Sequence, residues 1–591
     1  MPRSLSLAGF LLSVALYAQT GFFPLKDLRT GMRGTGRTVF SGTRIEEFQV
    51  EILGVLENVG PKQSIVLARL SGGPLEKTGV LQGMSGSPVY IQGRLLGAVA
   101  MSFPFSKEPL CAIRPIEEML RSAQGELEQS ARIRFSFRDG DLTRYFGRPA
   151  NFQTGPGRIV DIATPVAFSG FTRNTIEHFA PQLRALGLEP SQGISGGGRL
   201  LETSGNPAPL VPGSMISVLL LTGDMTISAD GTVTYVDGQK VYAFGHRFLS
   251  IGSTEIPFAR AEVLTLLPSL ASSFKISAPR EWAGTITQDR STAVTGELGR
   301  RAALAPISIS MTRHAASGRQ QVRSNYHMEM VNDPFLSPFL VQMAVFSAID
   351  ATERTIGSST LAIRGEIEFK DGSAPIRLNN MYAGDFSVPQ QASLGTAVPL
   401  AYALQSGFQS LRLRNIKLDI DSFDERKTMQ IDQVWASRRI VRPGETVQLT
   451  VSLLGSNGKE LVRKVSYTIP IGMPAGTLYF TVADGNTTNM AEFRQILDSN
   501  LKSPSQLIAF LNSLRNNTNA YVRIWRQGQD YSIQGQDLPN PPPSVDQILA
   551  RSQASLGSTL LSTDSKVAEM VIDSGGFVVT GSRSIQVEVK Q

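Results

Sequence analysis

A short turn in the first quarter of the chain, GMSGSP at residues 83–88, combines two glycines with two serines. A serine hydroxyl becomes a nucleophile when a neighbouring base takes its proton, and the oxyanion that then forms needs two aimed backbone N–H donors. Glycine before the serine lets the backbone curl, so that the N–H groups of Gly83 and Ser85 point into one pocket, and Gly86 leaves room for a substrate. Ser85 is therefore the candidate nucleophile, and Gly83 and Ser85 form the candidate oxyanion hole. The alternative is a glycine-rich hairpin with an incidental serine.

A base for this serine must come from one of four histidines. His246 stands in YAFGHRF, at the end of a β-like run and directly after a glycine. The other three lie in an amphipathic helical pattern, an arginine-rich stretch and a β-like run, in the order His178, His314 and His327. His246 is the candidate base. Sequence position alone does not decide the matter, because catalytic triads are defined by geometry and occur in different chain orders.

The elements that must position these residues are mainly β. Between residues 38 and 100, short β-like runs alternate with glycine-bearing turns, and Gln92-Gly93 is a hairpin signal. A second β-rich block begins near residue 212, where Asp237-Gly238 separates two alternating runs. Each block is expected to form a small barrel or sandwich, and a short helix is expected in RPIEEMLRSAQ after the first block.

Two segments resemble a known family. The stretch from IEEFQVEILGV through GVLQGMSGSPVYIQGRLLGAVAM to IRPIEEML is similar to the catalytic serine region of the SpoIVB-type (sporulation stage IV B) serine peptidases, and GTVTYVDGQKVYAFGHRF is similar to their histidine region. The resemblance implies a trypsin-like double β-barrel, with Ser85 as nucleophile and His246 as general base. In that family the histidine half precedes the serine half, so the order here implies a circular permutation.

The third member of the triad is unknown. The position that matches the family's aspartate is Ser71, which cannot hold a histidine tautomer by charge. Four acidic residues lie near His246 in sequence, and each is equally well explained by turn chemistry or solvation: Asp224, Asp237, Glu255 and Asp289.

The 591 residues predict several domains and a mainly β fold class: a permuted trypsin-like double barrel, an immunoglobulin-like sandwich and small α/β C-terminal regions. The expected division is a signal peptide at 1–18, the serine barrel half at 19–125, a connector with a helix and a Gly-rich loop at 126–211, the histidine barrel half at 212–330, a helix plus β region at 331–425, the sandwich at 426–485, a helical/β region at 486–540, and a Pro-rich linker with a β tail at 541–591.

The composition of the chain and its N-terminal residues bear on export, on disulfide and metal chemistry, and on nucleic-acid binding. Arg3 followed by an apolar run from Leu5 to Leu16 predicts a secretory signal, and no later stretch is long enough for a membrane span in the mature chain. Cys111 is alone, so no intrachain disulfide can form, and one Cys with four scattered histidines predicts neither a metal site nor another cofactor. The net charge is +7, but no aromatic residues that could stack on bases are interleaved in the arginine-rich stretch. Nucleic acid is therefore disfavoured as a partner.

Two functions follow from these observations. The first is an exported serine endopeptidase that acylates Ser85 and acts on protein or peptide substrates in the periplasm, at the outer envelope or outside the cell. The second is an inactive pseudopeptidase that keeps the two-barrel fold as an envelope binding or assembly protein, with envelope proteins as partners. The missing aspartate, the permuted order of the two halves and the large non-catalytic remainder favour the second function. The peptidase is nevertheless the function that we expect.

Overall fold

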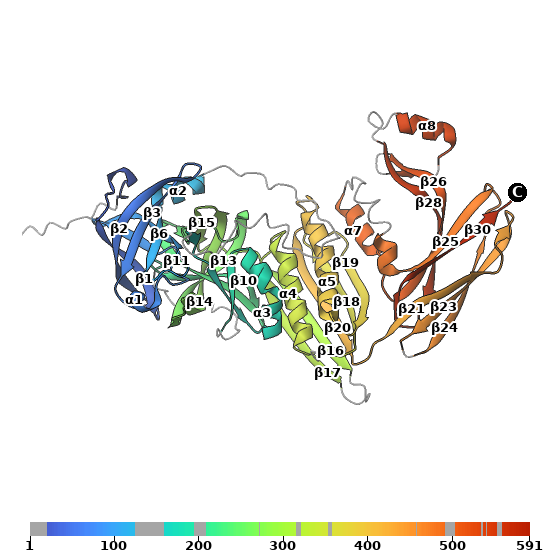
Figure 1. The fold of residues 1–591 in the computed structure, drawn as a ribbon, viewed down its shortest axis with the longest axis horizontal. Helices are drawn as coiled ribbons and strands as arrows, with labels where there is room; N and C mark the ends of the chain where they lie inside the picture. Colours follow the sequence, from blue (N-terminus) through green and yellow to red (C-terminus); the bar gives the residue numbers. More distant parts are fainter. Residues whose placement is uncertain are drawn as a thin grey trace, which may run out of the picture.

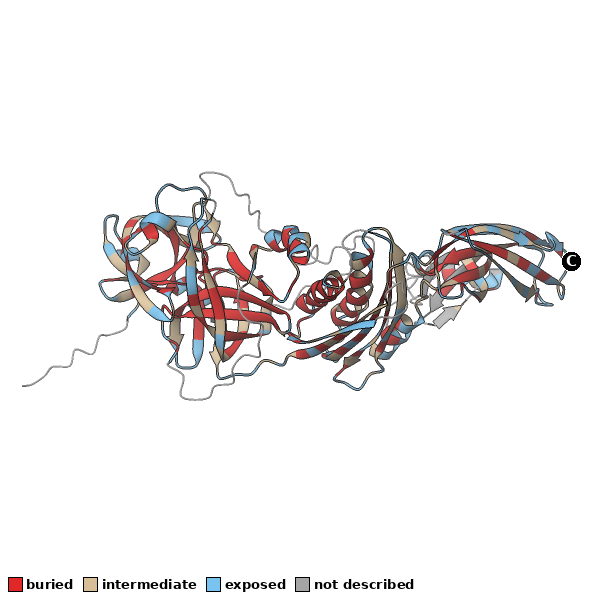
Figure 2. Ribbon diagram, turned by 90° about the horizontal axis from the view of Figure 1, so that it is seen from below, coloured by how far each residue is buried: buried red, intermediate tan, exposed pale blue. Residues whose placement is uncertain are grey.

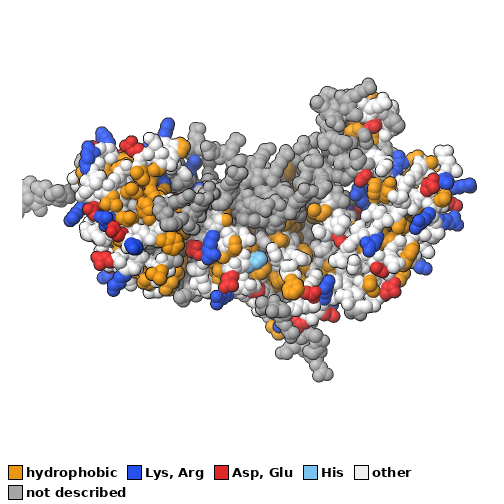
Figure 3. Space-filling view, viewed as in Figure 1, with side chains coloured by type: hydrophobic (Ala, Val, Ile, Leu, Met, Phe, Trp, Pro, Cys, Tyr) orange, Lys and Arg blue, Asp and Glu red, His pale blue; other side chains and the backbone are white. Residues whose placement is uncertain are grey.

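The protein is elongated, with two barrels at the N-terminal end and a β-sandwich at the C-terminal end (Figure 1). The computed structural model describes residues 21–124, 159–193, 209–270, 272–314, 321–352, 357–456, 458–490, 503–533, 536–538, 541–551 and 558–591. The predicted signal peptide and the Gly-rich loop from residue 194 onward lie outside these ranges. Acidic and basic side chains are interspersed on the face drawn in Figure 3, and apolar side chains gather over the first barrel.

Six antiparallel strands close the first barrel, in the order β4-β1-β2-β3-β6-β5 with β5 pairing back onto β4. Gln92 and Gly93 both have left-handed φ angles, 52° and 75°, which fits the tight β4–β5 hairpin that the sequence predicted. The helix expected after this block is α2. The bounds are β1 (Arg33–Ser41), β2 (Arg44–Gly60), β3 (Gln63–Ser71), α1 (Leu75–Thr78), β4 (Pro88–Ile91), β5 (Arg94–Ser102), β6 (Leu110–Pro115) and α2 (Ile116–Gln124), after a 3-10 turn at Leu25–Asp27.

The second barrel is also closed by six antiparallel strands, β10-β13-β14-β15-β12-β11, with β11 pairing back onto β10. The hairpin expected at Asp237-Gly238 joins β11 to β12, where Asp237 pairs with Lys240. The bounds are β10 (Met215–Gly223), β11 (Thr226–Asp237), β12 (Lys240–Ala243), β13 (Gly252–Leu267), β14 (Phe274–Arg290) and β15 (Ala293–Leu298). The fold is thus mainly β and contains closed barrels, as the sequence predicted.

The sheet of the second barrel continues in both directions beyond the barrel. On one side β11 pairs with β8, so part of the expected connector joins this sheet, and on the other side β10 pairs with β17. Helices α4 and α5 pack together over the part of this sheet that is formed by strands β16 to β20 (Figures 1 and 2). Helix α4 is buried along almost its whole length. The bounds are β7 (Val160–Asp161), β8 (Thr164–Ser169), α3 (Arg173–Ala185), β9 (Leu188–Gln192), β16 (Ala305–His314), β17 (Gln321–Met330), α4 (Leu336–Asp350), β18 (Ser359–Phe369), β19 (Ile376–Gly384), α5 (Val388–Gln405) and β20 (Leu413–Phe423).

A two-sheet sandwich forms the C-terminal end, and residues from both sheets share one apolar core. Strands from the range 426–485 pair with strands from the tail, β21 with β29 and β25 with β30, so the sandwich extends beyond that range. The bounds are β21 (Thr428–Ala436), β22 (Ile440–Val441), β23 (Thr446–Gly455), β24 (Glu460–Thr468), β25 (Gly476–Asp484), α7 (Pro504–Ser513), β26 (Asn519–Ile533), β27 (Gln536–Leu538), α8 (Pro543–Arg551), β28 (Ser558–Asp573), β29 (Val578–Thr580) and β30 (Ser582–Val589).

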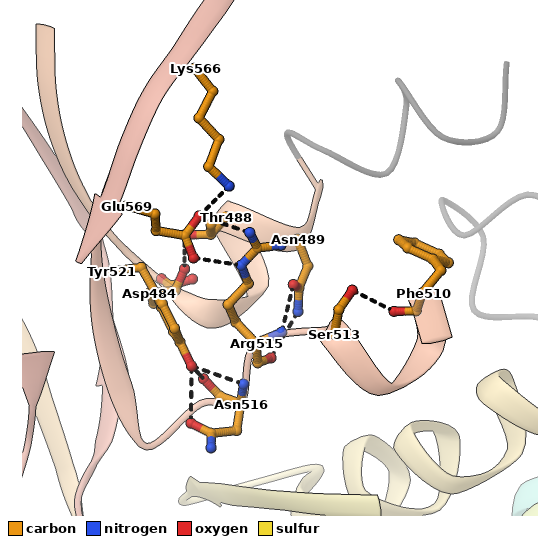
Figure 4. Close-up of polar contacts among 10 residues, drawn as sticks. All are labelled: Asp484, Thr488, Asn489, Phe510, Ser513, Arg515, Asn516, Tyr521, Lys566 and Glu569. Carbon is orange, nitrogen blue, oxygen red and sulfur yellow. Dashed lines mark hydrogen bonds and ion pairs between the residues drawn. The ribbon is translucent and has the colours of Figure 1, made fainter. Parts of the chain in front are cut away.

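A polar joint fixes the segment after α7 to the sandwich (Figure 4). Arg515 donates two hydrogen bonds to the carboxylate of Glu569, at 3.0 and 2.7 Å, and Lys566 reaches the same carboxylate at 2.7 Å. The backbone N–H of Arg515 donates to Asn489, whose side chain donates back to the Arg515 carbonyl. Asn512 on α7 bonds the backbone of β19, so α7 links the middle sheet to the sandwich.

Candidate functional site

The serine turn of the first barrel is held by strand β11 of the second barrel. The backbone N–H of Thr232 donates to the Ser85 carbonyl at 2.8 Å, and its hydroxyl donates to the Gly83 carbonyl at 2.9 Å. The hydroxyl of Thr234 donates to the Gly86 carbonyl at 2.7 Å. The turn therefore lies in the junction between the two barrels, although Ser85 and β11 are far apart in sequence.

The histidine loop follows β12 and turns sharply at Phe244 and Gly245, whose φ angles are 68° and 69°. A left-handed conformation is rare for a bulky residue such as Phe and persists only where the surroundings impose it. The Phe244 ring fills the space left by the absent side chain of Gly231, where a Cβ would lie 2.8 Å from the ring. The turn carries His246 toward the first barrel, and His246 is 2% exposed.

Both motifs meet at the same part of strand β5. The N–H of Gly86 donates to the Val99 carbonyl at 2.8 Å. A Cβ on Gly245 would lie 2.9 Å from the Ala98 side chain and 3.2 Å from that of Ala100. The Ser85 turn of the first barrel and the His246 loop of the second barrel therefore both contact the same three consecutive residues of β5.

The side chains of the candidate nucleophile and base are both buried and unpaired. Within the described residues, neither the Ser85 Oγ nor the His246 Nε2 has a hydrogen-bond partner, so the two atoms do not bond each other in this structure. His246 Nδ1 lies 2.6 Å from the Arg247 carbonyl oxygen. Because a carbonyl can only accept, Nδ1 carries the proton, and the unpaired Nε2 is the basic nitrogen.

Burial lowers the pKa of His246 below its ordinary value, and this effect outweighs the nearby Asp161 carboxylate, which raises it. The guanidinium groups of Arg114 and Arg247 lower the pKa further. The neutral imidazole, which is the form that can accept a proton, is therefore favoured over a wider pH range than in a free histidine.

The backbone donors of the turn divide into two groups. The N–H groups of Met84, Gly86 and Ser87 donate to carbonyl oxygens within the first barrel. In the part of the chain that the structure describes, no hydrogen bond uses the N–H of Gly83 or of Ser85. These two unpaired donors are the pair that the sequence predicted for the oxyanion hole.

The four acidic candidates for the third position have other partners or surroundings. Asp224 accepts from the His327 backbone at 2.7 Å, and Glu255 pairs with Arg300 at 2.7 Å. Asp237 is exposed in the hairpin turn, and Ser71, the position matching the family's aspartate, is exposed at the end of β3.

Asp289 is buried and accepts from the backbone N–H groups of Phe248 and Leu249 at 2.8 and 2.6 Å. Its role is to hold the loop that follows His246. Within the residues that the structure describes, Nδ1 bonds the Arg247 carbonyl and no carboxylate, so none of the four acids orients the ring.

Asp161 is the acidic residue that sequence reasoning missed. It lies on β7, which pairs with β5 opposite Met101, and its carboxylate is 3.8 Å from the Arg247 guanidinium. Its negative charge raises the pKa of His246, although burial of the ring lowers that pKa by more. No local pattern in the sequence pointed to Asp161, because it is far from both motifs in the chain.

A buried polar network lies beside the serine turn. The Lys275 ammonium donates to the Thr38 hydroxyl at 2.7 Å, and the Ser87 hydroxyl donates to the same oxygen at 3.1 Å. Burial lowers the pKa of Lys275 to about 7, against the opposing field of Asp230. Ser87 thus belongs to this inter-barrel network, which separates its role from that of the unpaired Ser85.

No group of three or more His, Cys, Asp or Glu side chains that would suit a metal ion occurs among the described residues. Within the same ranges, none of the helices combines the length and apolar character that a membrane crossing requires.

Two closed barrels, with a serine turn and a histidine loop at their junction, define a double-barrel protein. Residues 27–112 match the family model described as SpoIVB peptidase S55, which is the family that the sequence resembles over this part of the chain. The match includes Ser85 and ends before His246. No curated protein and no solved structure matches the chain.

Proposed function

We propose that the protein is a serine endopeptidase of the SpoIVB type in which the serine and histidine halves are permuted. Ser85 attacks the scissile carbonyl, and His246 Nε2 takes the hydroxyl proton and later returns it to the leaving amine. The N–H groups of Gly83 and Ser85 bind the oxyanion. The observation that carries the proposal is the pair of unpaired backbone donors beside a buried, unpaired serine hydroxyl.

This site differs from an acid-containing triad in the group that orients His246, which is a backbone carbonyl and not a carboxylate. The Arg247 carbonyl accepts from Nδ1 and so selects the tautomer with a basic Nε2. A neutral carbonyl stabilises the imidazolium less than a carboxylate does, which lowers the expected rate without removing the oxyanion hole. This same observation favours the second function, a pseudopeptidase that binds envelope proteins without cleaving them.

Fluorophosphonate labelling distinguishes the two functions. A fluorescent fluorophosphonate is expected to label the native protein at Ser85, identified by peptide mass mapping, because an activated serine reacts faster than surface hydroxyls. A folded protein that stays unlabelled at every pH between 5 and 9 would favour the pseudopeptidase.

The pH dependence of labelling is a separate prediction. The rate is expected to rise with pH and reach half its plateau below about 6.5, the ordinary histidine value, because burial lowers the pKa of His246 and only the neutral ring accepts the proton. Circular dichroism over the same range controls for unfolding. A half-rise above 6.5 would contradict the assignment of His246 as the base.

We further propose that the chain is exported, on the evidence of the charged start and the apolar run behind it. Protein isolated from its native cell should lack about the first eighteen residues. N-terminal sequencing measures this directly, and an intact Met1 on cytoplasmic material would contradict export.

A further inference from the structure

Access to the candidate site is closed in this structure. Ser85 is fully buried and His246 is 2% exposed, and both reactive atoms are buried without partners among the described residues. A peptidase site must admit an extended segment of its substrate, so part of the protein must move away before a substrate can reach Ser85. The segment that binds β5 directly beside the serine turn is the strap, defined here as residues 159–162.

The strap is bound to β5 as an added strand. β7 within it pairs antiparallel with the end of β5, Asp161 opposite Met101 and Val160 opposite Ser102. The Ile162 N–H donates to the Ala100 carbonyl at 2.9 Å. Strand β4 pairs with β5 only as far as Ala98, so the strap takes up the edge of β5 that β4 leaves uncovered.

Three segments therefore converge on Val99 and Ala100. The serine turn bonds the Val99 carbonyl through Gly86, the Ala100 side chain faces Gly245 beside His246, and the strap bonds the Ala100 carbonyl. Beyond the serine turn, the same edge of β5 is therefore already paired with the strap.

Two side chains anchor the strap, one on each barrel. Ile162 is 2% exposed and packs in the apolar core of the first barrel. Asp161 faces Arg247, the residue after His246, across 3.8 Å at the rim of the site. The anchors differ in strength, because Ile162 buries apolar surface whereas a partly exposed ion pair contributes little.

We propose that the strap is a built-in inhibitory strand, and that its displacement exposes an edge of β5 that binds an extended peptide by strand addition. A sheet edge recognises a peptide through backbone hydrogen bonds, and the strap shows that this edge accepts a strand in antiparallel register. The inhibitory role rests on the proposed peptidase function. The peptide-binding edge does not, and the two are tested separately.

A reversible disulfide tests the inhibitory role. Residues directly opposite in an antiparallel pair lie within the Cα separation that a disulfide needs, so Met101→Cys with Asp161→Cys locks the strap when oxidised. We expect oxidation to lower the rate of fluorophosphonate labelling about tenfold or more, because the open population is removed, and dithiothreitol to restore it. The native Cys111 is buried with a raised pKa and does not compete.

The matched control places a disulfide in the same barrel away from the strap, at Arg33→Cys with Glu51→Cys, which are opposed in the β1–β2 pair. Its oxidation should leave labelling unchanged. Ile162→Pro removes the N–H that donates to Ala100 and is expected to raise the labelling rate several-fold. Equal labelling of the locked and unlocked forms of the Met101/Asp161 variant would overturn the inhibitory role and leave the peptidase function intact.

A binding measurement without catalysis tests the edge itself. A fluorescein-labelled peptide with the sequence IVDIAT, residues 159–164, is added to each form and followed by fluorescence anisotropy. We expect binding to the Ile162→Pro variant and to the reduced cysteine variant, and none to the oxidised lock. Selective binding without labelling in any form would support the edge and contradict the peptidase, whereas equal anisotropy in all forms would overturn the proposed edge.

Discussion

Replacing Ser85 or His246 by alanine is expected to lower hydrolysis of fluorescent casein by about four orders of magnitude or more, down to background. Ser85→Ala removes the nucleophile, and His246→Ala removes the unpaired Nε2 that we propose as the base. The two losses should be nearly equal, and the double variant should be no worse than either single one, because nucleophile and base act as a unit.

Ser87→Ala is the matched control for these variants. Ser87 has the same side chain, lies two residues away and is equally buried, but its hydroxyl donates to Thr38 in the inter-barrel network. We expect it to retain hydrolysis and labelling within a few-fold, with a modest loss of stability from the missing hydrogen bond. Retained activity in Ser85→Ala together with its loss in Ser87→Ala would reassign the nucleophile.

The second large effect concerns the fit between the barrels. Gly86 has a φ of 93°, and a Cβ at this position would lie 1.9 Å from the Thr232 carbonyl oxygen and 2.6 Å from the Phe244 backbone nitrogen. All of the opposing atoms are backbone atoms of the second barrel, so no side chain can turn away to make room. Gly86→Ala is expected to reduce the free energy of unfolding of the paired barrels by roughly 3–5 kcal/mol and to abolish labelling of Ser85.

Gly93→Ala separates the steric clash from the backbone conformation. Gly93 also has a positive φ, 75°, but its Cβ would meet nothing within 4 Å. This control should cost only about 1–2 kcal/mol, the ordinary penalty for a left-handed residue. Hydrogen exchange of peptides from β5 and β11 during urea titration measures both variants, and equal costs for the two would show that the barrel junction is not tightly packed at Gly86.

The lowered pKa of His246 also affects stability. Its folded-state pKa lies below the value of about 6.5 expected in the unfolded chain, so the unfolded state binds more protons as the pH falls through this range. The contribution of His246 to stability is therefore retained above about pH 6.5 and is progressively lost below it.

The sequence by itself determined much of the secondary structure and both chemical motifs. Hairpin signals at Gln92-Gly93 and Asp237-Gly238 correspond to observed turns, because glycine readily adopts the left-handed φ that these tight loops need, 75° at Gly93 and 58° at Gly238. The serine region was identified from the local pattern of the GMSGSP turn, and the family match at 27–112 confirms the resemblance there. These features depend on neighbouring residues, which is why local patterns could predict them.

Only the tertiary structure decided which distant residues contact the serine turn and the His246 loop. Thr232 and Thr234 hold the serine turn, Asp289 holds the loop after His246, and Asp161 reaches the site along the strap. None of these pairings is visible in the sequence, because each joins distant residues through strand register and barrel closure, and register depends on the packing of whole sheets. For the same reason, the orientation of His246 by a backbone carbonyl could not be predicted from residue types, since every residue carries that acceptor and only the fold brings one to Nδ1.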